Sequence, residues 1–265
     1  MEVLKIKLSY LFKKTGGKSK EGPPERFERK FVIIPEKTGL VLALLRHLCL
    51  PDRQFPKDRV FSLYFDTPDL DQYQKSGAGE HRKDKVRIRW YGSDLVKSGE
   101  IPVYLEQKIR RGFASSKYRR RFTVPAEALR KENLVNGILS RRTIIETLAG
   151  FGYFPEKPLR PVVLISYRRY RFNELMTGAR VSFDEDIRAE LIALDLGRRE
   201  GEIRLPNAVL EVKGPRLELP PTLRRLSVMD LDWSRFSKYG NCLDILFDKP
   251  GSVSRHWPSG KLVLP

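Results

Sequence analysis

Cysteine and histidine are scarce in this 265-residue chain, which has only two cysteines and three histidines. Cys49 and Cys242 are too few for a disulfide scaffold or a cysteine-rich zinc site, and they fit a reducing compartment. The histidines lie far apart in the sequence and show no metal-ligand spacing. The sequence therefore excludes a disulfide-stapled fold and gives no sign of a zinc site.

Long apolar runs are also missing. The richest one, residues 39–50, is interrupted by Arg46 and His47, whereas a membrane span needs about 20 apolar residues. The N-terminus is basic, but it lacks the apolar core and small-residue cleavage site of a secretory signal. We therefore expect a cytoplasmic protein, with the inner face of a membrane as an alternative location.

Acidic residues are outnumbered, because 51 lysines and arginines face 33 aspartates and glutamates, for a formal net charge of +18. An excess of this size concerns the partners of a protein rather than its fold. It favours a polyanion: a nucleic acid, polyphosphate, a nucleotide or an anionic membrane.

The composition divides the chain into three parts. Residues 1–24 form a basic leader, residues 25–250 hold the periodic segments of one domain, and residues 251–265 form an irregular tail. In the leader, apolar residues alternate with lysine before a run rich in glycine and proline. Two interpretations stay open for it: a surface extension, edge strand or helix, or an anchor to an anionic membrane or a membrane protein.

Alternation of apolar and polar residues dominates from residue 27 onward and is typical of half-buried strands. It predicts eight strands, at residues 27–34, 60–67, 84–92, 102–109, 117–124, 161–172, 179–186 and 208–215. Helical patterns are expected at residues 35–48, 134–150 and 234–247, with a shorter one at 221–229. The expected fold class is therefore α+β.

The polar faces of these strands carry mostly cations. Lys85, Arg87 and Arg89 share one face of their strand, and apolar residues occupy the other. A single strand of this kind is common where one face of a sheet meets solvent. Six strands with the same cationic face are harder to explain in this way, because adjacent like charges on a sheet repel each other unless an anion binds them. Eight antiparallel strands are expected to close into a β-barrel with flanking helices and a cationic interior. An open sheet with a basic face is the alternative.

Six short motifs occur in order: FERKF (27–31), SLYFDT (62–67), VRIRWYG (86–92), LEQK (105–108), LEVK (210–213) and FSKY (236–239). Over about residues 26–245 they resemble the VTC domain, the polyphosphate polymerase domain of the triphosphate tunnel metalloenzyme (CYTH-like) superfamily. The resemblance implies an eight-stranded tunnel that binds ATP or another triphosphate, and polyphosphate, with Mn²⁺ or Mg²⁺. It also implies transfer of the ATP γ-phosphate to a growing polyphosphate chain.

One position departs from the superfamily pattern Glu-x-Glu-x-Lys on the first strand. Arg26 replaces the first glutamate, which leaves Glu28 and Lys30. The loss of a carboxylate weakens a two-metal scheme and favours the polymerase branch over the hydrolytic branches. In the second motif, Tyr64 and Asp66 are assigned to strand packing and to the turn that follows.

Phosphoryl transfer depends mainly on positioning and on neutralising charge. Arg87 and Arg89 lie two residues apart on one strand, a spacing of roughly 6–7 Å, so both are expected to clamp a triphosphate. The other expected catalytic residues each follow a glutamate by two positions: Lys30, Lys108 and Lys213. Those glutamates are the expected metal ligands, in the order Glu211, Glu106 and Glu28. A lattice of cross-strand salt bridges is the structural alternative.

The resemblance adds six expected phosphate-binding residues: Lys117, Arg121, Arg169, Arg180, Ser237 and Lys238. A solvated strand face remains the alternative for residues 117–121, whose inward parity is open. A helix surface remains the alternative for Ser237 and Lys238. Asp184 lies on the face of Arg180 and is expected to pair with it, with a metal-binding or water-positioning role as the alternative.

Three functions stay open at this point. The first is a metal-dependent polyphosphate polymerase with ATP as the phosphate donor. The second, on the same fold, is a tripolyphosphatase or nucleoside triphosphatase, in which water attacks instead of phosphate. The third is a module that binds polyphosphate or RNA without turnover. Nucleic acid is the weaker expectation, because Trp90, Phe122 and Phe183 lie on apolar faces and cannot stack on bases.

Overall fold

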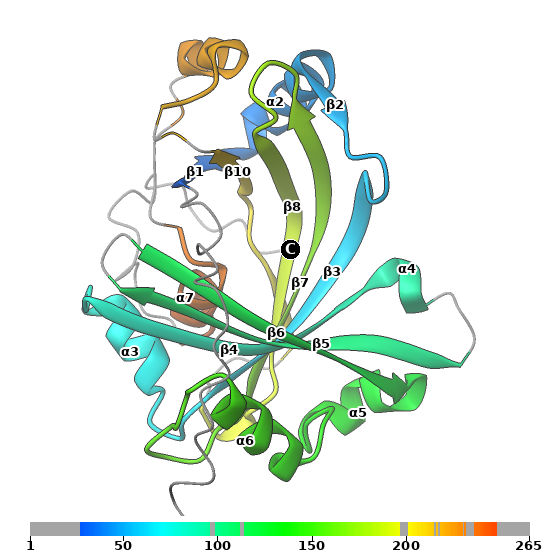
Figure 1. Cartoon of the computed structure of the whole chain (residues 1–265), viewed down its shortest axis with the longest axis vertical. Coiled ribbons are helices and arrows are strands. Elements are labelled where there is room, and N and C mark those ends of the chain that lie inside the picture. The colour runs from blue at the N-terminus through cyan, green and yellow to red at the C-terminus, as the bar shows by residue number, and fades with distance from the viewer. Residues whose placement is uncertain are drawn as a thin grey trace, which may run out of the picture.

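The alternating sequences form an antiparallel sheet that curls on itself, with helices around it (Figure 1). The computed structural model describes residues 27–95, 99–111, 114–196, 201–214, 216, 218–229, 231 and 236–247. The expected leader at 1–24 and tail at 251–265 lie outside the described residues. Within them, no helix is long and apolar enough to cross a membrane.

All eight predicted strands are present: β1 (Phe27–Ile33), β3 (Lys57–Asp66), β4 (Arg82–Tyr91), β5 (Glu100–Arg111), β6 (Ala114–Pro125), β7 (Arg160–Glu174), β8 (Arg180–Leu191) and β10 (Ala208–Gly214). Two short strands escaped prediction, β2 (Cys49–Pro51) beside β7 and β9 (Glu202–Arg204) beside β8. Three residues are too few for a periodic signal to be detected.

The strands follow the order β1-β10-β8-β7-β3-β4-β5-β6. β1 and β6 stand at the two ends of this order, and no backbone pairing between described residues joins them. Instead, Lys108 of β5 donates a hydrogen bond of 3.2 Å to Glu28 of β1. This contact requires the sheet to curl until its two ends approach. The expected barrel is therefore a curled sheet whose ends meet through side chains on its concave face.

The helices match the prediction in part. α2 (Pro35–Leu48) has the expected bounds, with proline at its first position, where no amide is needed. The expected helix at 134–150 is split into α5 (Lys131–Leu134) and α6 (Arg141–Gly150). Val135 caps the end of the first part, Gly137 lies in the turn that follows at a φ of 78°, and Ser140 caps the second part by accepting from the amide of Thr143.

Two of the expected helices differ from the prediction, and four short elements were not predicted. The expected helix at 221–229 is the 3-10 helix η3 (Pro221–Met229), and the last helix, α7, begins later than expected (Lys238–Leu246). The elements that escaped prediction are α3 (Asp71–Gly77), α4 (Gly92–Leu95), η1 (Ala126–Leu129) and η2 (Leu194–Leu196). All four are short, so their apolar periodicity is weak.

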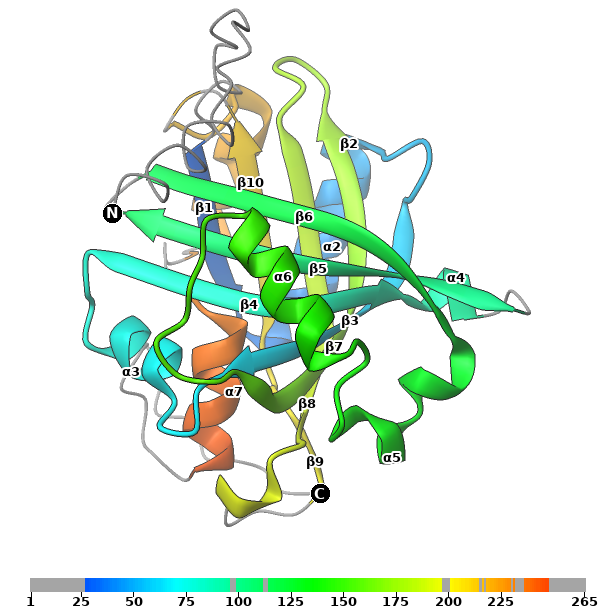
Figure 2. The same ribbon diagram turned by 60° about the horizontal axis from the view of Figure 1, so that its bottom comes forward.

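Two apolar clusters lie where the prediction placed them, on the convex side of the sheet under helices. In one, Val41 and Leu45 of α2 pack with Phe31 and Leu210, and η3 adds residues to the same cluster. In the other, α6 packs on β4 and β5, and Figure 2 shows α6 crossing in front of β5. Burial of this apolar face directs the charged face of the same strands inward.

The helix α7 is the exception, because it packs on the concave side. Its Tyr239 belongs to one cluster with Tyr64, Tyr167 and Val209, which lie on the charged face of their strands, further along. The Tyr64 and Tyr239 rings stack with centroids 4.9 Å apart. One end of the curled sheet is therefore filled by α7, which lies beside α3 in Figures 1 and 2. Alternation along a strand does not reveal that one face changes from charged to apolar.

A buried carboxylate holds this end together. Asp66, fully buried at the end of β3, accepts hydrogen bonds from the amides of Thr67, Gln72 and Tyr73. It also accepts one of 2.6 Å from the hydroxyl of Tyr239 on α7. The expected turn role of Asp66 is thus present, and the same side chain also ties α3 and α7 to the sheet.

We predict that Asp66→Asn lowers the free energy of unfolding by about 1–3 kcal/mol, because hydrogen bonds to a charged acceptor are lost inside the protein. Urea denaturation followed by circular dichroism measures this. Asp69→Asn is the control, since Asp69 is exposed and pairs only at the surface with Lys157. It should change the free energy by less than about 0.5 kcal/mol. Equal effects of the two changes would remove Asp66 from this structural role.

Candidate functional site

Cross-strand register arranges the inward residues of β4, β5 and β6 in rows. The rows are Lys85, Lys108 and Lys117; then Arg87, Glu106 and Arg119; then Arg89, Tyr104 and Arg121. Both Lys117 and Arg119 reach Glu106, with nitrogen–oxygen distances of 2.6 and 3.5 Å. The parity of this strand, left open by the sequence, is therefore inward for residues 117 and 119. Arg121 follows by alternation and is exposed.

Glu106 is the centre of charge on this wall. Besides Lys117 and Arg119, it pairs with Arg87 at 2.8 Å and lies 3.8 Å from Arg89, while its own side chain is only 1% exposed. Burial alone would raise the pKa of Glu106, but Arg87, Arg89 and Lys117 outweigh it and hold the pKa well below its ordinary value. One carboxylate therefore stabilises four cations.

The two predicted clamp residues are held in fixed orientations. Arg87 uses two of its nitrogens on Glu106 and donates from a third to the hydroxyl of Tyr64 at 3.0 Å. Arg89 is 6% exposed and donates to Ser62 and to the hydroxyl of Tyr167. Because a guanidinium has five N–H groups, Arg87 keeps two for a ligand.

The opposite wall carries acids and lysines in alternation. Glu28 on β1 lies opposite Lys213 on β10, and Lys30 lies opposite Glu211. Glu28 pairs with Lys30 at 2.9 Å, and Glu211 pairs with Lys213. Burial acts against the charge on Lys30, but Glu28 and Glu211 outweigh it, so the pKa of Lys30 is raised. The salt-bridge lattice that the sequence offered as the structural alternative is therefore present, and it is formed by the same residues as the expected site.

Asp184 does not pair with Arg180, as the sequence suggested. It accepts two hydrogen bonds from Arg169, of 2.6 and 2.7 Å, and it forms an ion pair of 2.6 Å with Lys238 of α7. Arg180 is exposed at the start of β8, opposite Lys213. The error has a physical cause: alternation gives the face of a residue, but its partner depends on the neighbouring strand and on α7.

The N-terminus of α7 brings Ser237 and Lys238 to the charged face. Ser237 caps α7, and its hydroxyl accepts a hydrogen bond of 2.8 Å from Lys85. Lys85 was missing from the predicted site, although its position two residues before Arg87 was a usable signal. Arg119 was missing from the predicted site as well. Its position between Lys117 and Arg121, on the same face of the strand, was again a usable signal.

The surroundings of the three lysines in the first row destabilise their charged forms and so lower their pKa values. Burial and the nearby Lys30 and Lys108 lower the pKa of Lys85 to about 7. Burial also lowers the pKa of Lys108 and of Lys117 to about 8 each, although carboxylates partly offset it. A bound anion would relieve this cost, so the row favours anions over cations.

The acids fit a divalent metal only as part of a complex with phosphate. Burial and the charge of Glu211 raise the pKa of Glu28, but Lys30, Lys108 and Lys213 outweigh them and lower it to about 2. The described residues hold no cluster of three metal-binding side chains, so Glu106 is not gathered with this pair. Mg²⁺ commonly takes one or two carboxylates and completes its shell with phosphate oxygens and water. The Glu28 and Glu211 pair meets that requirement.

The structure is a curled antiparallel sheet with cations packed on its concave face. The family model described as VTC domain matches residues 25–247, so the chain belongs to the VTC domain family. This confirms the resemblance drawn from the six motifs. A comparison with curated proteins finds no match.

One solved structure shares the fold at low sequence identity, and a second was also matched. A proposed adenylate cyclase from Bacillus halodurans is 14% identical with a TM-score of 0.50, over 81% of this chain and 94% of that one. A proposed adenylyl cyclase from Hippeastrum with a dominant triphosphatase activity is 14% identical with a TM-score of 0.43, over 83% and 96%. At such identity the first likeness supports the fold alone.

We predict that Glu106→Gln lowers the free energy of unfolding by roughly 3–5 kcal/mol, because the surrounding cations lose their buried counter-charge. Tripolyphosphate should then raise the Tm of the variant more than that of the unchanged protein, since the ligand supplies the missing negative charge. Differential scanning fluorimetry measures both effects.

The control is Glu185→Gln, which removes a carboxylate that pairs with Arg168 and Tyr170 away from this cluster. Its response to tripolyphosphate should equal that of the unchanged protein. A Glu106→Gln response no larger than the control would show that this cluster is not where the anion binds.

Proposed function

We propose that this protein is a metal-dependent polyphosphate polymerase that transfers the γ-phosphate of ATP to a growing polyphosphate chain. The proposal joins membership of the VTC domain family to one observation, the excess of cations on the concave face. Among the described residues whose contacts on this face are given above, four carboxylates, Glu28, Glu106, Glu211 and Asp184, lie among ten cations: Lys30, Lys85, Arg87, Arg89, Lys108, Lys117, Arg119, Arg169, Lys213 and Lys238.

A linear polyanion matches this surface better than a single phosphate does. The rows of β4, β5 and β6 repeat every second residue, so cations recur at roughly 6–7 Å along the strands. Neighbouring phosphates share one bridging oxygen and lie closer together than this, so successive rows meet every second phosphate of a chain. The carboxylates oppose a nucleic-acid backbone, and the concave aromatic residues Tyr64 and Tyr104 lie beneath Arg87 and Arg119, which cover their rings.

In this proposal Arg87 and Arg89 hold the triphosphate, and the ion pairs that orient them avoid reorganisation during the reaction. Lys30, Lys108 and Lys213 neutralise the phosphate oxygens from the other side. The remaining contacts are assigned to Lys117, Arg121, Arg169, Arg180, Ser237 and Lys238. Among them, Arg121 and Arg180 are exposed, so they would meet the chain at the edge of the site.

The metal in the proposal is Mn²⁺ or Mg²⁺, held by Glu211 and Glu28, and it would supply positive charge to phosphate oxygens. Glu106 is left out of the ligand set because four cations already occupy its oxygens. In the reaction itself, a terminal oxygen of the polyphosphate chain forms a bond to the γ-phosphorus, and the bond from that phosphorus to the β-bridging oxygen breaks. ADP leaves, and the chain is longer by one phosphate.

The test is an assay of the purified protein with ATP and Mn²⁺ or Mg²⁺. Products are separated on a gel stained for polyphosphate, while ADP and free phosphate are measured in parallel. A ladder of polymer with matching ADP supports the proposal. Free phosphate equal to ADP, without polymer, would replace it with a triphosphatase. Without turnover, metal-independent and salt-sensitive binding of polyphosphate would make the protein a binding module.

We predict that Glu211→Gln lowers metal-dependent turnover by about 100-fold or more, since loss of even an indirect metal contact costs 10- to 100-fold. Affinity for tripolyphosphate without metal should be kept or increased, because an anion is removed from the site. Glu185→Gln serves again as the matched control. Full activity of Glu211→Gln in Mg²⁺ would assign the metal to other residues.

We also predict a pH dependence of binding. A bound polyanion raises the pKa of Lys85 above its value of about 7 in the empty site. Its contribution to affinity is therefore complete below pH 7 and is lost as the pH rises through the pKa of the complex. Affinity for tripolyphosphate should fall between pH 7 and pH 9, with proton uptake on binding.

Isothermal titration calorimetry in two buffers of different ionisation enthalpy measures the uptake. Lys85→Arg should reduce it, because arginine stays charged throughout this range. Lys75→Arg, at an exposed position of α3, is the control and should leave it unchanged. Comparison of these variants cancels the titration of tripolyphosphate itself. Equal uptake in both would remove Lys85 from the binding site.

A further inference from the structure

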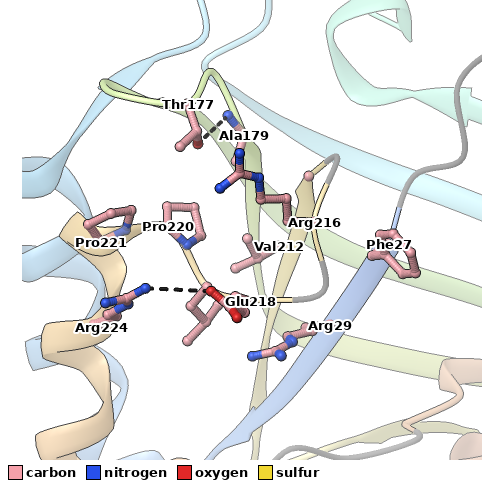
Figure 3. A pocket seen from close by; sticks show the side chains of 12 residues that line it. Phe27, Arg29, Thr177, Ala179, Val212, Arg216, Glu218, Pro220, Pro221 and Arg224 are labelled. Atoms are coloured by element: carbon pink, nitrogen blue, oxygen red, sulfur yellow. Dashed lines mark hydrogen bonds and ion pairs between the residues drawn. The ribbon is translucent and has the colours of Figure 1, made fainter.

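A cavity of about 300 Å³ lies on the outer side of β1 and β10, away from the charged concave face. Its apolar lining includes Phe27, Val212, Leu219 and Pro220 (Figure 3). A volume of this size is at the lower end of the range for small-molecule sites, which are mostly apolar with a few charged groups. The cavity therefore has the dimensions of a binding site for a small organic molecule.

Charged groups at the cavity carry a net positive charge. Three arginines line it, Arg29, Arg216 and Arg224, against the single acid Glu218. Arg224 lies 3.6 Å from Glu218, so this pair is mutually compensated. Among the residues that the structure describes, none forms an ion pair with Arg29 or Arg216. Two cations beside an apolar surface thus remain available for one ligand.

The walls of the cavity are fixed before any ligand binds. Pro220 and Pro221 have restricted backbones, and the next residue, Thr222, donates a hydrogen bond to the buried Glu174. Leu223 and Leu226 of η3 are buried in the cluster that holds α2 against the sheet. A preformed wall lowers the cost of ordering on binding, so a small ligand can bind there with useful affinity.

We propose that this cavity binds an amphipathic organic anion, whose charged head meets Arg216 and whose apolar body lies against Val212, Leu219 and Pro220, while Arg29 adds positive charge at the other end of the lining. An inorganic phosphate would leave the apolar wall unused, and a neutral apolar molecule would leave both arginines without a partner. The site is separate from the concave face, although Arg29 lies between Glu28 and Lys30 on β1. It does not depend on the proposed polymerase activity.

The experiment uses the full chain with saturating tripolyphosphate, so that the concave face is already occupied. The fluorescent sulfonate 1-anilinonaphthalene-8-sulfonate is the probe, and three competitors are compared: octanoate, octanamide and acetate. Octanoate has both the charge and the apolar body, whereas each of the others lacks one of them. We expect octanoate to displace the probe at a concentration at least about tenfold lower than either of the others requires.

The variants are Arg29→Gln with Arg216→Gln, and the control pair Arg130→Gln with Arg141→Gln, two exposed arginines on other elements. Probe affinity should fall about tenfold or more in the first pair and stay unchanged in the control. Since Arg29 lies within β1, the exposed change Arg216→Gln is also measured alone, with circular dichroism to verify folding, and should weaken the probe severalfold. Equal displacement by octanoate and octanamide, displacement of the probe by tripolyphosphate, or equal probe affinity in the unchanged protein and Arg216→Gln would each overturn the proposal.

Discussion

The structure depends on one electrostatic constraint, the confinement of many cations to a concave face with few carboxylates. Adjacent like charges on a sheet repel, so such a face folds only if each carboxylate serves several cations. Glu106 does so for the wall of β4, β5 and β6, and Asp184 does so where β7 meets α7. The Glu28 and Lys108 pair joins the two ends of the sheet in the same way. Removing one acid therefore disturbs the wall as a whole, not a single contact.

This constraint also connects stability with binding. Lysines whose pKa is depressed, above all Lys85, represent free energy that a polyanion can recover when it binds. Under the proposed function, the same cations that weaken the empty fold would provide affinity for the ligand. Protein sites that bind charge strongly commonly show this opposition between stability and function. The apolar end of the concave face supplies compensation, because Asp66 and Tyr239 anchor α7 there.

Neighbouring residues of β1 and β10 point to opposite faces of the sheet, and the two faces differ in charge and polarity. Glu28 and Lys30 face the concave side, while Arg29 faces the outer cavity, and Val212 alternates in the same way between Glu211 and Lys213. A strand exposes alternate residues to opposite sides, so two sites of different selectivity can share a wall. In the two proposals, the concave side binds a multiply charged chain, and the outer side binds an apolar body with one charge.

The sequence by itself determined the eight long strands, the cationic character of one face and the membership suggested by six ordered motifs. These features follow from local alternation and spacing, which a strand converts directly into a face. It did not determine the partner of Asp184, the entry of α7 into the concave side or the inclusion of Lys85 in the site. Each of these depends on which distant elements meet: Lys238 with Asp184, Tyr239 with Asp66, and Ser237 with Lys85. Only the curl of the sheet and the docking of α7 decide those contacts, because the residues are far apart along the chain.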